Sequence, residues 1–395
     1  MKKVVILGGG YAGIYALREL IKEPHIKITL IDKHTYQNIQ PEVYDLIANK
    51  ANMADVTIDL ASLCAGVKHS YVEYKNLRVV DIDFDKKEIY TQEKEIVVYD
   101  YLIIAIGGRT LFPRSIEGLN HTDDLKKLHK ALFFKQSFET QLFNKVSDGA
   151  KKCDKTHIAV IGAGLSGVEI AAEMAYYAKK FFERGSFACD NFRISLISSG
   201  STILSGFDKE IVKMSHDRLK ELKINIVTNS KMTGCDNEYL YLDNGTKIRY
   251  AFIVFAGGVE ASNLATKLNL SKNTKNQIIV RDTLQTKEYD NVFAIGDIAE
   301  IKDAQGTKMP ANVTVARATG ICCAQNVLNS IKDKPLHECN PKLQGTLIAL
   351  GGRYAVCDLY GVVKLKGFLA YLIKQFVFLT YKLPLLHIIK NAHKK

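Results

Sequence analysis

The sequence predicts an α/β protein made of two similar parallel-sheet units followed by an apolar helical tail. An apolar strand, a glycine-rich turn and a helix follow one another at residues 4–21, and the same succession recurs at residues 157–182. Strands that alternate with helices in this way are typical of doubly wound parallel sheets. The last 37 residues are rich in apolar side chains and contain seven lysines but no acidic residue.

Composition narrows the class of protein. The chain has 395 residues, of which 47% are hydrophobic and 24% charged, so two or three ordered domains are expected and global disorder is excluded. Eight cysteines without a C-x-x-C pair exclude a disulfide framework and favour a reducing compartment. The ten histidines show no metal-ligand spacing, so no metal site is expected. The start of the chain shows no signal-peptide pattern, which favours a cytosolic origin.

The first unit opens with a buried strand that leads into the turn Gly8–Gly13 and a helix. The next strand alternates apolar and polar residues and ends at Asp32. A polar loop (34–40), a helix (44–49), strands near 67–71, 77–84 and 88–98, and a strand at 101–106 that ends at Gly107-Gly108 are expected to follow.

The second unit follows a polar helical connector at residues 111–154. Its expected elements are a strand (157–161), the turn Gly162–Gly167, a helix (168–182), and strands at 192–197 and 253–256, the last ending at Gly257-Gly258. A strand at 292–295, Gly296-Asp297 and a helix at 313–331 come next. The repeat indicates two nucleotide-binding units in one chain.

Both turns carry the G-x-G-x-x-G spacing between a strand and a helix, the context that makes this pattern a dinucleotide-binding fingerprint. In each turn the first glycine allows the tight bend, the second lets a pyrophosphate approach the backbone, and the third lets the helix pack on the strand. The three glycines are Gly8, Gly10 and Gly13 in the first turn, and Gly162, Gly164 and Gly167 in the second. Asp32 is placed to bind a ribose hydroxyl. In the second unit the strand at 192–197 is followed by Ser198-Ser199, with no acid to bind a ribose 2′-hydroxyl and no arginine to bind a 2′-phosphate. NADH is favoured over NADPH only because this basic residue is absent.

Two such units, with Ala105-Ile106-Gly107-Gly108 after the first and Ile295-Gly296-Asp297 near the end, resemble the two-dinucleotide-binding-domain flavoproteins. The resemblance covers about residues 1–330. It implies that the first unit binds FAD, that the second is inserted into it and binds NAD(P)H, and that Asp297 contacts the flavin. The implied domains are FAD-binding (1–113 and 285–335), NAD(P)H-binding with its connector (114–284) and membrane-docking (336–395).

Within that superfamily the chain resembles the type II NADH:quinone dehydrogenases. The similar segments are Gln40–Asp45, Gly164–Glu169, Ala256–Val259, Met309–Ala311 and the basic apolar tail. The resemblance implies a peripheral membrane enzyme of a respiratory chain that oxidises NADH through FAD and reduces a quinone without pumping protons. The family often has A-Q-x-A-x-Q after its Pro-Ala, whereas this chain has Thr314 and Ala318 at the two glutamine positions.

The resemblance implies three groups of site residues. Those for FAD are Gly8, Gly10, Tyr11, Ala12, Gly13, Asp32, Lys33, Val80, Ala105, Gly107, Gly296, Asp297 and Thr314. Those for NADH are Gly162, Gly164, Leu165, Ser166, Gly167, Glu169, Ser199, Gly257 and Gly258. Those for the quinone are Gln40, Pro41, Tyr44, Thr314, Arg317 and Ala318.

Two of these residues are candidates for a part in the reaction. Glu169 is the candidate catalytic residue, which either orients the nicotinamide or relays protons, and its alternative is a solvated glutamate at a helix N-terminus. Arg317 either polarises a quinone oxygen or faces solvent.

Two other functions stay open. A sulfide:quinone oxidoreductase needs reactive cysteines, for which Cys153 and Cys357 are the candidates, while Cys322 and Cys323 are expected to be small buried hydrophobes. A redox sensor that binds both nucleotides with little turnover is the other alternative. The redox cysteine pairs of disulfide reductases are absent from the sequence.

Most of the net positive charge lies in the tail, residues 359–395. Its seven lysines contribute +7 of the net charge of +12, which leaves +5 for the other 358 residues. Four of them (366, 374, 382 and 390) interrupt the apolar tail regularly, so no apolar interval is long enough to span a bilayer. We expect a helix in the membrane interface, with its lysines among anionic lipid phosphates, on the cytoplasmic face of the inner membrane. Packing in the core or in a homodimer is the alternative, and no nucleic-acid motif is present.

Overall fold

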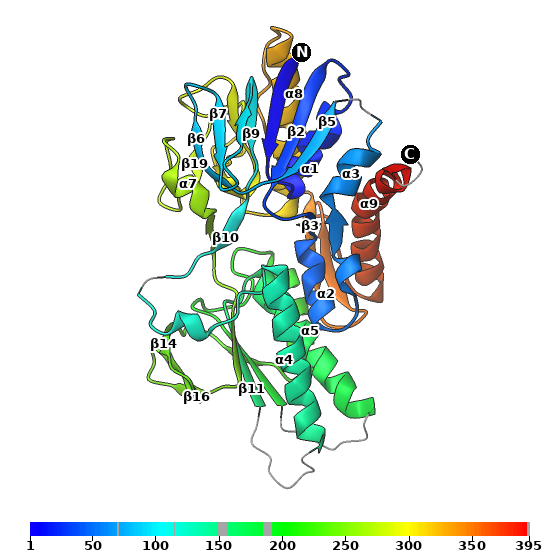
Figure 1. Ribbon diagram of the computed structural model, residues 1–395. Helices are drawn as coiled ribbons and strands as arrows, with labels where there is room; N and C mark the ends of the chain where they lie inside the picture. The colour runs from blue at the N-terminus through cyan, green and yellow to red at the C-terminus, as the bar shows by residue number, and fades with distance from the viewer. Residues whose placement is uncertain (69–70, 114, 148–155, 185–191, 393–395) are drawn as a thin grey trace.

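The computed structural model describes residues 1–68, 71–113, 115–147, 156–184 and 192–392. Its first unit is a five-stranded parallel sheet in the order β20-β9-β1-β2-β5 (Figure 1). These strands are β1 (Lys2–Leu7), β2 (Ile26–Asp32), β5 (Val72–Asn76), β9 (Tyr101–Ile104) and β20 (Val292–Ala294). The sheet therefore joins the start of the chain to a strand nearly 190 residues after β9.

Helices and short strands surround this sheet. Helix α1 (Tyr11–Leu20) packs on α8 (Val313–Ile331). The remaining elements of the first unit are β3 (Tyr36–Asn38), α2 (Val43–Ile47), β4 (Thr57–Asp59), α3 (Leu60–Gly66), β6 (Val79–Asp83), β7 (Glu88–Thr91), β8 (Ile96–Val98), α7 (Asn263–Lys267), β19 (Ile278–Ile279) and β21 (Ala299–Glu300). Helix α3 occupies most of the region before β5, so the strand expected near residues 67–71 begins later, at Val72; residues 69–70 lie outside the described part.

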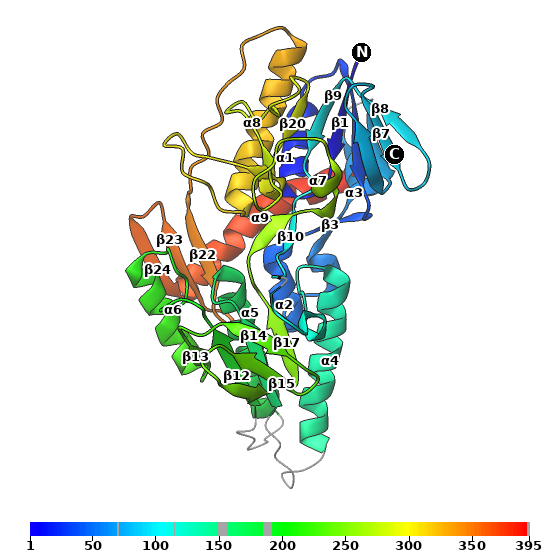
Figure 2. The ribbon, with the colours of Figure 1, turned by 90° about the vertical axis from the view of Figure 1, so that its left-hand side faces the viewer.

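The second unit is a four-stranded parallel sheet in the order β13-β12-β11-β17 (Figure 2). Its elements are α4 (Leu128–Ser147), β11 (Thr156–Ile161), α5 (Leu165–Arg184), β12 (Phe192–Ile197), α6 (Lys209–Glu221), β13 (Asn225–Val227), the antiparallel strands β14 (Met232–Cys235), β15 (Tyr239–Leu242) and β16 (Lys247–Arg249), and β17 (Phe252–Phe255). In the connector, the described helix α4 is confined to residues 128–147.

Two antiparallel strands join the units. The chain leaves the first unit through β10 (Gly108–Thr110) and returns through β18 (Val259–Ala261). The Arg109 guanidinium and the Glu260 carboxylate form an ion pair at 2.8 Å across them. This arrangement confirms the predicted fold, in which one dinucleotide-binding domain is inserted into the other.

A three-stranded antiparallel sheet was not expected from the sequence and corrects the picture of a purely helical tail. It consists of β22 (Gly345–Ala349), β23 (Ala355–Leu359) and β24 (Val363–Gly367). Glycines at positive φ form its turns, Gly351 and Gly352 in the first and Gly361 in the second. The sheet packs against α5 and α6 of the second unit.

Helix α9 (Phe368–Ala392) continues through Pro384. Its inner side buries Ala370, Lys374, Tyr381 and Leu385. The side chains on its exposed side are largely apolar too, so the helix is apolar on both sides rather than amphipathic. The large exposed apolar side chains are Phe368, Leu369, Leu372, Phe376, Val377, Leu379 and Leu383. Among the described residues it is the one helix long and apolar enough to cross a membrane by length and composition, with a mean hydropathy of 1.3.

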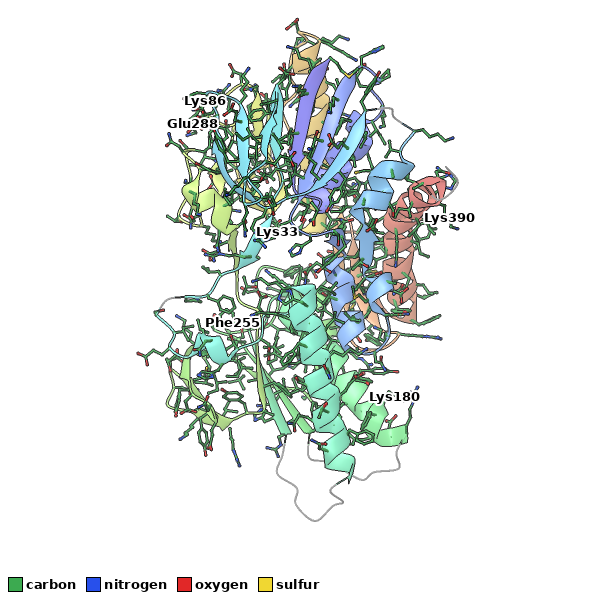
Figure 3. All side chains as sticks on the ribbon, in the orientation of Figure 1. Lys33, Lys86, Lys180, Phe255, Glu288 and Lys390 are labelled. Atoms are coloured by element: carbon green, nitrogen blue, oxygen red, sulfur yellow. A yellow bond between two sulfur atoms is a disulfide. The ribbon has the colours of Figure 1, made fainter. Side chains whose placement is uncertain are left out.

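The lysines of the tail do not all face outward, which corrects the expectation that they lie among lipid phosphates. Lys374 is 2% exposed, Lys382 lies 4.0 Å from the Glu42 carboxylate, and Lys364 pairs with Asp208 at 2.8 Å. Lys366 and Lys390 are exposed, and Figure 3 shows Lys390 near the end of α9. Lys394 and Lys395 lie outside the described residues.

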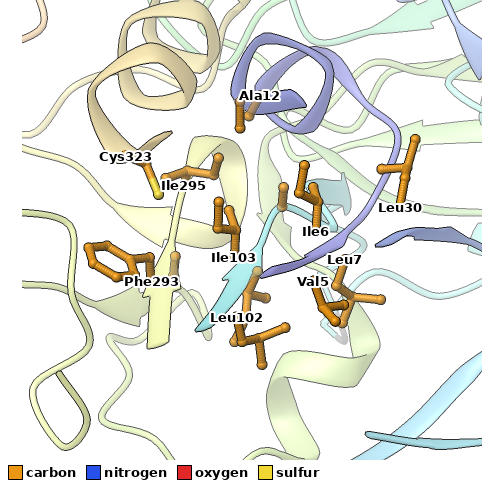
Figure 4. Packing of buried hydrophobic residues seen from close by; sticks show 14 of the residues in the cluster. Val5, Ile6, Leu7, Ala12, Leu30, Leu102, Ile103, Phe293, Ile295 and Cys323 are labelled. Atoms are coloured by element: carbon orange, nitrogen blue, oxygen red, sulfur yellow. The ribbon is translucent and has the colours of Figure 1, made fainter. Parts of the chain in front are cut away.

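The main core lies between the first sheet and the helices α1 and α8. Ile6, Ile103 and Phe293 from three parallel strands lie near Ala12 and Cys323 from the two helices (Figure 4). Burying one such large apolar side chain contributes about 1.5–3 kcal/mol to the free energy of unfolding. This core holds the glycine turn at the ends of β1 and β9 in a rigid frame.

Candidate active site

The first glycine turn has the geometry that a pyrophosphate needs. Gly8 has φ +116°, and a Cβ there would lie 2.4 Å from the Ala105 oxygen. A Cβ at Gly13 would lie 1.9 Å from the Gly8 oxygen, so α1 can approach β1 this closely only with glycine. Gly10 faces open space at the start of α1, where Tyr11 and Ala12 present free backbone N–H groups. The turn therefore leaves a helix N-terminus open to an anion.

The second turn repeats this geometry. Gly162 has φ +102°, and a Cβ at Gly167 would lie 1.8 Å from the Gly162 oxygen. Gly164 again faces open space, and Leu165 and Ser166 begin α5. The two halves of the molecule thus present the same anion-binding turn, in the first unit at β1 and in the second at β11.

At the end of β2, Asp32 accepts backbone hydrogen bonds from Gly9 (2.7 Å) and His34 (2.8 Å). A cavity of about 300 Å³ opens beside it. The cavity is lined by Leu7, Gly8, Ile31, Asp32, Lys33, Leu77, Arg78, Val79, Val80, Ile106, Ser262, Asn263, Leu264 and Lys267. Figure 3 shows Lys33 at the lower edge of the first sheet. Arg78 and the segment 262–267 were not predicted, since nothing in their local sequence marks them and only the return strand β18 brings the segment here.

The remaining residues assigned to FAD converge from distant segments. Gly296 packs against Ala12, since a Cβ on Gly296 would lie 3.1 Å from that methyl group. Gly107 has φ +64° and faces open space, and Thr314 is half-buried in the first turn of α8. Burial raises the pKa of Asp297, and the positive charge of Lys126 opposes this shift. Lys126 was not among the predicted residues.

The residues present fit a bound flavin nucleotide. Buried polar atoms without a hydrogen-bond partner in the described part of the chain include Tyr11 Oη, Asn38 Oδ1 and Gln40 Nε2. Buried polar atoms are rarely left unsatisfied in folded proteins, so these atoms indicate a polar ligand between α1 and the loop before α2. FAD is a ligand of this kind, and the open Gly10 turn, Asp32 and the cavity would receive its pyrophosphate, ribose and adenine.

Glu169 is the fifth residue of α5 and is buried, so the alternative of a solvated glutamate is wrong. Its Oε1 accepts the backbone N–H of Ala349 at 2.9 Å. Burial raises the pKa of its carboxyl to about 7, although Lys374 acts in the opposite direction. A carboxyl of this kind is half protonated near neutral pH and can both donate and accept a proton.

Of the residues assigned to the quinone, Tyr44 of α2 lies near Glu169. Burial raises the pKa of Tyr44 to about 12, with the Glu169 charge adding to the effect and hydrogen bonds to Ser166 and Gln40 opposing it. Gln40 Oε1 accepts a hydrogen bond from Asn38 at 3.1 Å, and Pro41 is half-buried in the same turn.

The α8 residues of the quinone group are placed differently. Thr314 and Ala318 are half-buried, whereas Arg317 is exposed. The Arg317 guanidinium lies over the Tyr15 ring at 5.8 Å from its centroid, so the structure favours the solvent-facing alternative for this residue.

In the second unit, Ser199 is exposed at the end of β12. The preceding Ser198 is buried and its hydroxyl donates to the Thr202 oxygen at 3.0 Å. A Cβ at Gly257 would lie 2.3 Å from the Phe255 ring, and the Gly258 oxygen accepts the N–H of Leu111 at 2.8 Å. These residues form one edge at the ends of β11, β12 and β17.

A cluster of buried and half-buried charges beside Glu169 was not predicted. It consists of Asp45 after the start of α2, Lys50, Glu173 on α5 and Lys374 on α9. No local pattern marks these residues as partners, because they come from three segments that meet only in the folded chain. Lys374 in particular was expected among lipid headgroups.

The described cysteines do not support sulfide chemistry. Cys357 is buried in β23, and burial raises its pKa and that of Cys323, which disfavours the reactive thiolate. Cys322 is not a free buried thiol as expected but forms a disulfide with Cys339. Cys153 lies outside the described residues.

Comparison with known proteins identifies the class. The family model described as pyridine nucleotide-disulphide oxidoreductase matches residues 2–320, so the chain belongs to that family. The type II NADH:quinone oxidoreductase of Haemophilus influenzae is 28% identical to this chain over 391 residues, covering 91% of this chain and 87% of the relative. The predicted resemblance to type II NADH dehydrogenases is thereby confirmed.

Two solved structures share the fold. NDH2 from Plasmodium falciparum in complex with NADH has a TM-score of 0.85 at 20% identity and covers 100% of this chain and 98% of its own. The sulfide:quinone oxidoreductase of Aquifex aeolicus has a TM-score of 0.81 at 20% identity and covers 99% of this chain and 92% of its own. Structures this distant in sequence show the fold alone, so the relative of Haemophilus influenzae and the described cysteines separate the two activities.

Proposed function

We propose that this chain is a membrane-associated flavoenzyme that oxidises NADH through FAD and reduces a quinone. The observation that carries this function is the position of Glu169. It lies two residues after the last glycine of the second fingerprint, is buried, and has a pKa raised to about 7. The first turn would hold FAD and the second NADH, which brings both nucleotides to this carboxyl.

The chain binds and orients the nucleotides and supplies protons, while a bound FAD would supply the redox chemistry, which is the transfer of a hydride and of electrons. The glycine turns hold the two pyrophosphates. Glu169 Oε1 is held by the Ala349 N–H, so Oε2 is the oxygen available to hold a proton. Reduction of a quinone to a quinol takes up two protons, and Glu169 is the group in this site with a pKa near 7.

An anaerobic titration of the FAD-loaded protein tests this function. NADH should bleach the flavin absorbance, and a short-chain quinone should restore it within one turnover. Bleaching by sulfide but not by NADH would replace the proposal with sulfide oxidation. Slow bleaching without reoxidation by quinone would favour a redox sensor.

The membrane-docking surface in this proposal is the exposed apolar face of α9. Deleting residues 359–395 would not test it cleanly, because Tyr381 and Leu385 belong to the main core and Leu359 ends a strand. We therefore propose the double variant Phe376→Glu and Leu383→Glu, whose side chains are 67% and 56% exposed. Each loss of a buried apolar side chain costs about 1.5–3 kcal/mol, so membrane binding should fall about 100-fold or more in vesicle flotation.

The finer assignments belong to the same proposal. Anionic lipids are the expected partners of Lys366 and Lys390, and vesicles with and without phosphatidylglycerol should differ in binding, less so for the Lys366→Gln and Lys390→Gln variants. The cytoplasmic face is tested by protection from protease in right-side-out vesicles. A homodimer through the face of α9 is the competing proposal. It predicts a mass change in the Phe376→Glu and Leu383→Glu variant by light scattering, with unchanged flotation.

A further inference from the structure

Two lysines with opposite environments lie beside Glu169. Lys50 follows α2, and its side chain is 21% exposed, whereas Lys374 on α9 is 2% exposed. They share one carboxylate, because Asp45 Oδ1 lies 2.5 Å from Lys50 Nζ and Asp45 Oδ2 lies 3.6 Å from Lys374 Nζ. The surrounding acidic groups are therefore divided unequally between the two ammonium groups.

The Lys50 ammonium lies among three oxygen atoms. Besides Asp45, its ammonium lies 2.8 Å from Glu173 Oε1 and 3.2 Å from the Gly352 oxygen. The ammonium donates hydrogen bonds to Glu173 and Gly352, and it holds Asp45 through the ion pair. The other oxygen of Glu173 accepts the Gly352 N–H at 3.3 Å, so this carboxylate is satisfied without Lys374.

Lys374 has an ion-pair partner, Asp45 Oδ2 at 3.6 Å, but no hydrogen bond to any residue in the described part of the chain. Its Nζ is buried. It lies 5.0 Å from the centroid of the Phe378 ring. A buried ammonium whose donors are unmet is costly, and Asp45 and Glu173 would attract it strongly if Lys50 did not hold them.

We propose that Lys50 is a positioning residue that occupies Asp45 and Glu173, and thereby keeps the Lys374 ammonium free to donate to the carbonyl oxygen of the quinone. This inference rests on the proposed function. Lys50 touches neither nucleotide turn and acts only through its neighbours. Without it, Lys374 turns toward Asp45 and Glu173 and is withdrawn from the acceptor.

The groups that face Glu169 determine how the pH dependence responds. They are Lys374 of α9, Asp45 and Tyr44 of α2, Glu173 of the same helix and the Ala349 N–H of β22. Lys374 is the one positive charge in this set and favours the ionised form of Glu169. If Lys374 moves away, the negative charges of Asp45 and Glu173 remain beside Glu169. The pKa of the Glu169 carboxyl then rises, so it takes up its proton at a higher pH.

The test measures the two half-reactions of the FAD-loaded Lys50→Met variant separately by stopped flow from pH 5.5 to 9. Reduction of the flavin by NADH should stay within about twofold of the unmodified protein. Reoxidation by a short-chain quinone should slow about tenfold or more, a barrier increase of about 1.4 kcal/mol. Its pH midpoint should move upward. The Lys50→Arg variant should keep the reoxidation rate and the pH midpoint of the unmodified protein, because a guanidinium also bridges two carboxylates.

Lys364→Met is the matched control. Lys364 also bridges two carboxylates, Asp208 at 2.8 Å and Glu210 at 3.5 Å, and its side chain is 20% exposed. It lies on β24 and its two partners belong to the start of α6, so its variant should leave reoxidation and its pH midpoint unchanged. Should Lys50→Met fail to fold, the double variant Lys50→Met and Glu173→Gln removes one unpaired carboxylate and should still slow reoxidation through Asp45.

Three results would overturn the inference. These are an unchanged rate and pH midpoint of reoxidation, equal slowing of both half-reactions, or a slow Lys50→Arg variant. The unmodified protein separates this inference from the proposed function. If its flavin is not reduced by NADH or not reoxidised by quinone, the proposed function fails before any variant is compared.

Discussion

The two nucleotide-binding units share their backbone geometry but differ in the side chains around it. Gly8 and Gly162 both have positive φ. At Gly13 and Gly167, an added Cβ would lie less than 2 Å from a backbone oxygen, so both helices can pack this closely only with glycine. The first unit adds Asp32, which is held by two backbone N–H groups, whereas the second ends in Ser199. Backbone geometry thus makes both units receptors for a pyrophosphate, and side chains decide which nucleotide is held and how tightly.

The third glycine of each turn gives the sharpest separation of the two units. Gly13→Ala and Gly167→Ala each place a methyl group against a backbone oxygen, and such overpacking costs about 1–3 kcal/mol or more. Gly13→Ala should purify with little FAD. Gly167→Ala should keep its FAD but require about 10 to 100 times more NADH for flavin bleaching.

The flavin-to-protein ratio and the NADH titration measure these two effects. Gly234→Ala serves as the control, since its Cβ would lie an ordinary 3.5 Å from the nearest atom. If Gly167→Ala loses FAD as readily as Gly13→Ala, the two turns do not serve separate nucleotides.

The residues at the ends of β2 and β12, Asp32 and Ser199, should give the next largest effects. Asp32→Ala removes charge-assisted hydrogen bonds worth about 1.5–3 kcal/mol each, so the dissociation constant of FAD should rise about 10- to 100-fold. In the second unit, Ser199→Glu supplies the missing carboxylate and should raise the preference for NADH over NADPH about tenfold. Isothermal titration and the ratio of kcat/KM for the two coenzymes measure these changes. An unchanged coenzyme ratio in Ser199→Glu would contradict the placement of Ser199 beside the ribose.

Glu169, in the second unit, should affect stability rather than nucleotide binding. Its pKa of about 7 lies above the ordinary 4.5, so the folded protein binds this proton more tightly than the unfolded chain between those pH values. The free energy of unfolding therefore falls as pH rises through this window. Glu169→Gln lacks this term, so its stability relative to the unmodified protein should increase from pH 5 to pH 8 by up to about 3 kcal/mol.

Urea unfolding at several pH values checks this sign. Asp32→Asn is a suitable comparison, because this carboxylate is held by backbone N–H groups in the first unit. A difference between Glu169→Gln and the unmodified protein that shrinks with rising pH would show that Glu169 is ionised when buried.

Local sequence predicted the parts of the site that consist of consecutive residues. Each glycine turn lies between its own strand and helix, so spacing alone located Gly8, Gly10 and Gly13 and their counterparts. The short strands β22 to β24 were missed, although Gly351-Gly352 and Gly361 mark their turns. Arg317 could not be placed from sequence, because its orientation depends on the contact of α8 with Tyr15 of α1.

The sequence by itself determined the repeated dinucleotide-binding turns, the acid at the end of β2, the order of the units and the apolar tail, since these depend on neighbours along the chain. Only the tertiary structure decided which lysines of the tail face outward and which charges surround Glu169. Lys374 and Lys50 are 324 positions apart in the sequence, yet both lie beside Asp45. Burial and long-range pairing determine the state of such groups, and neither is encoded in the local pattern.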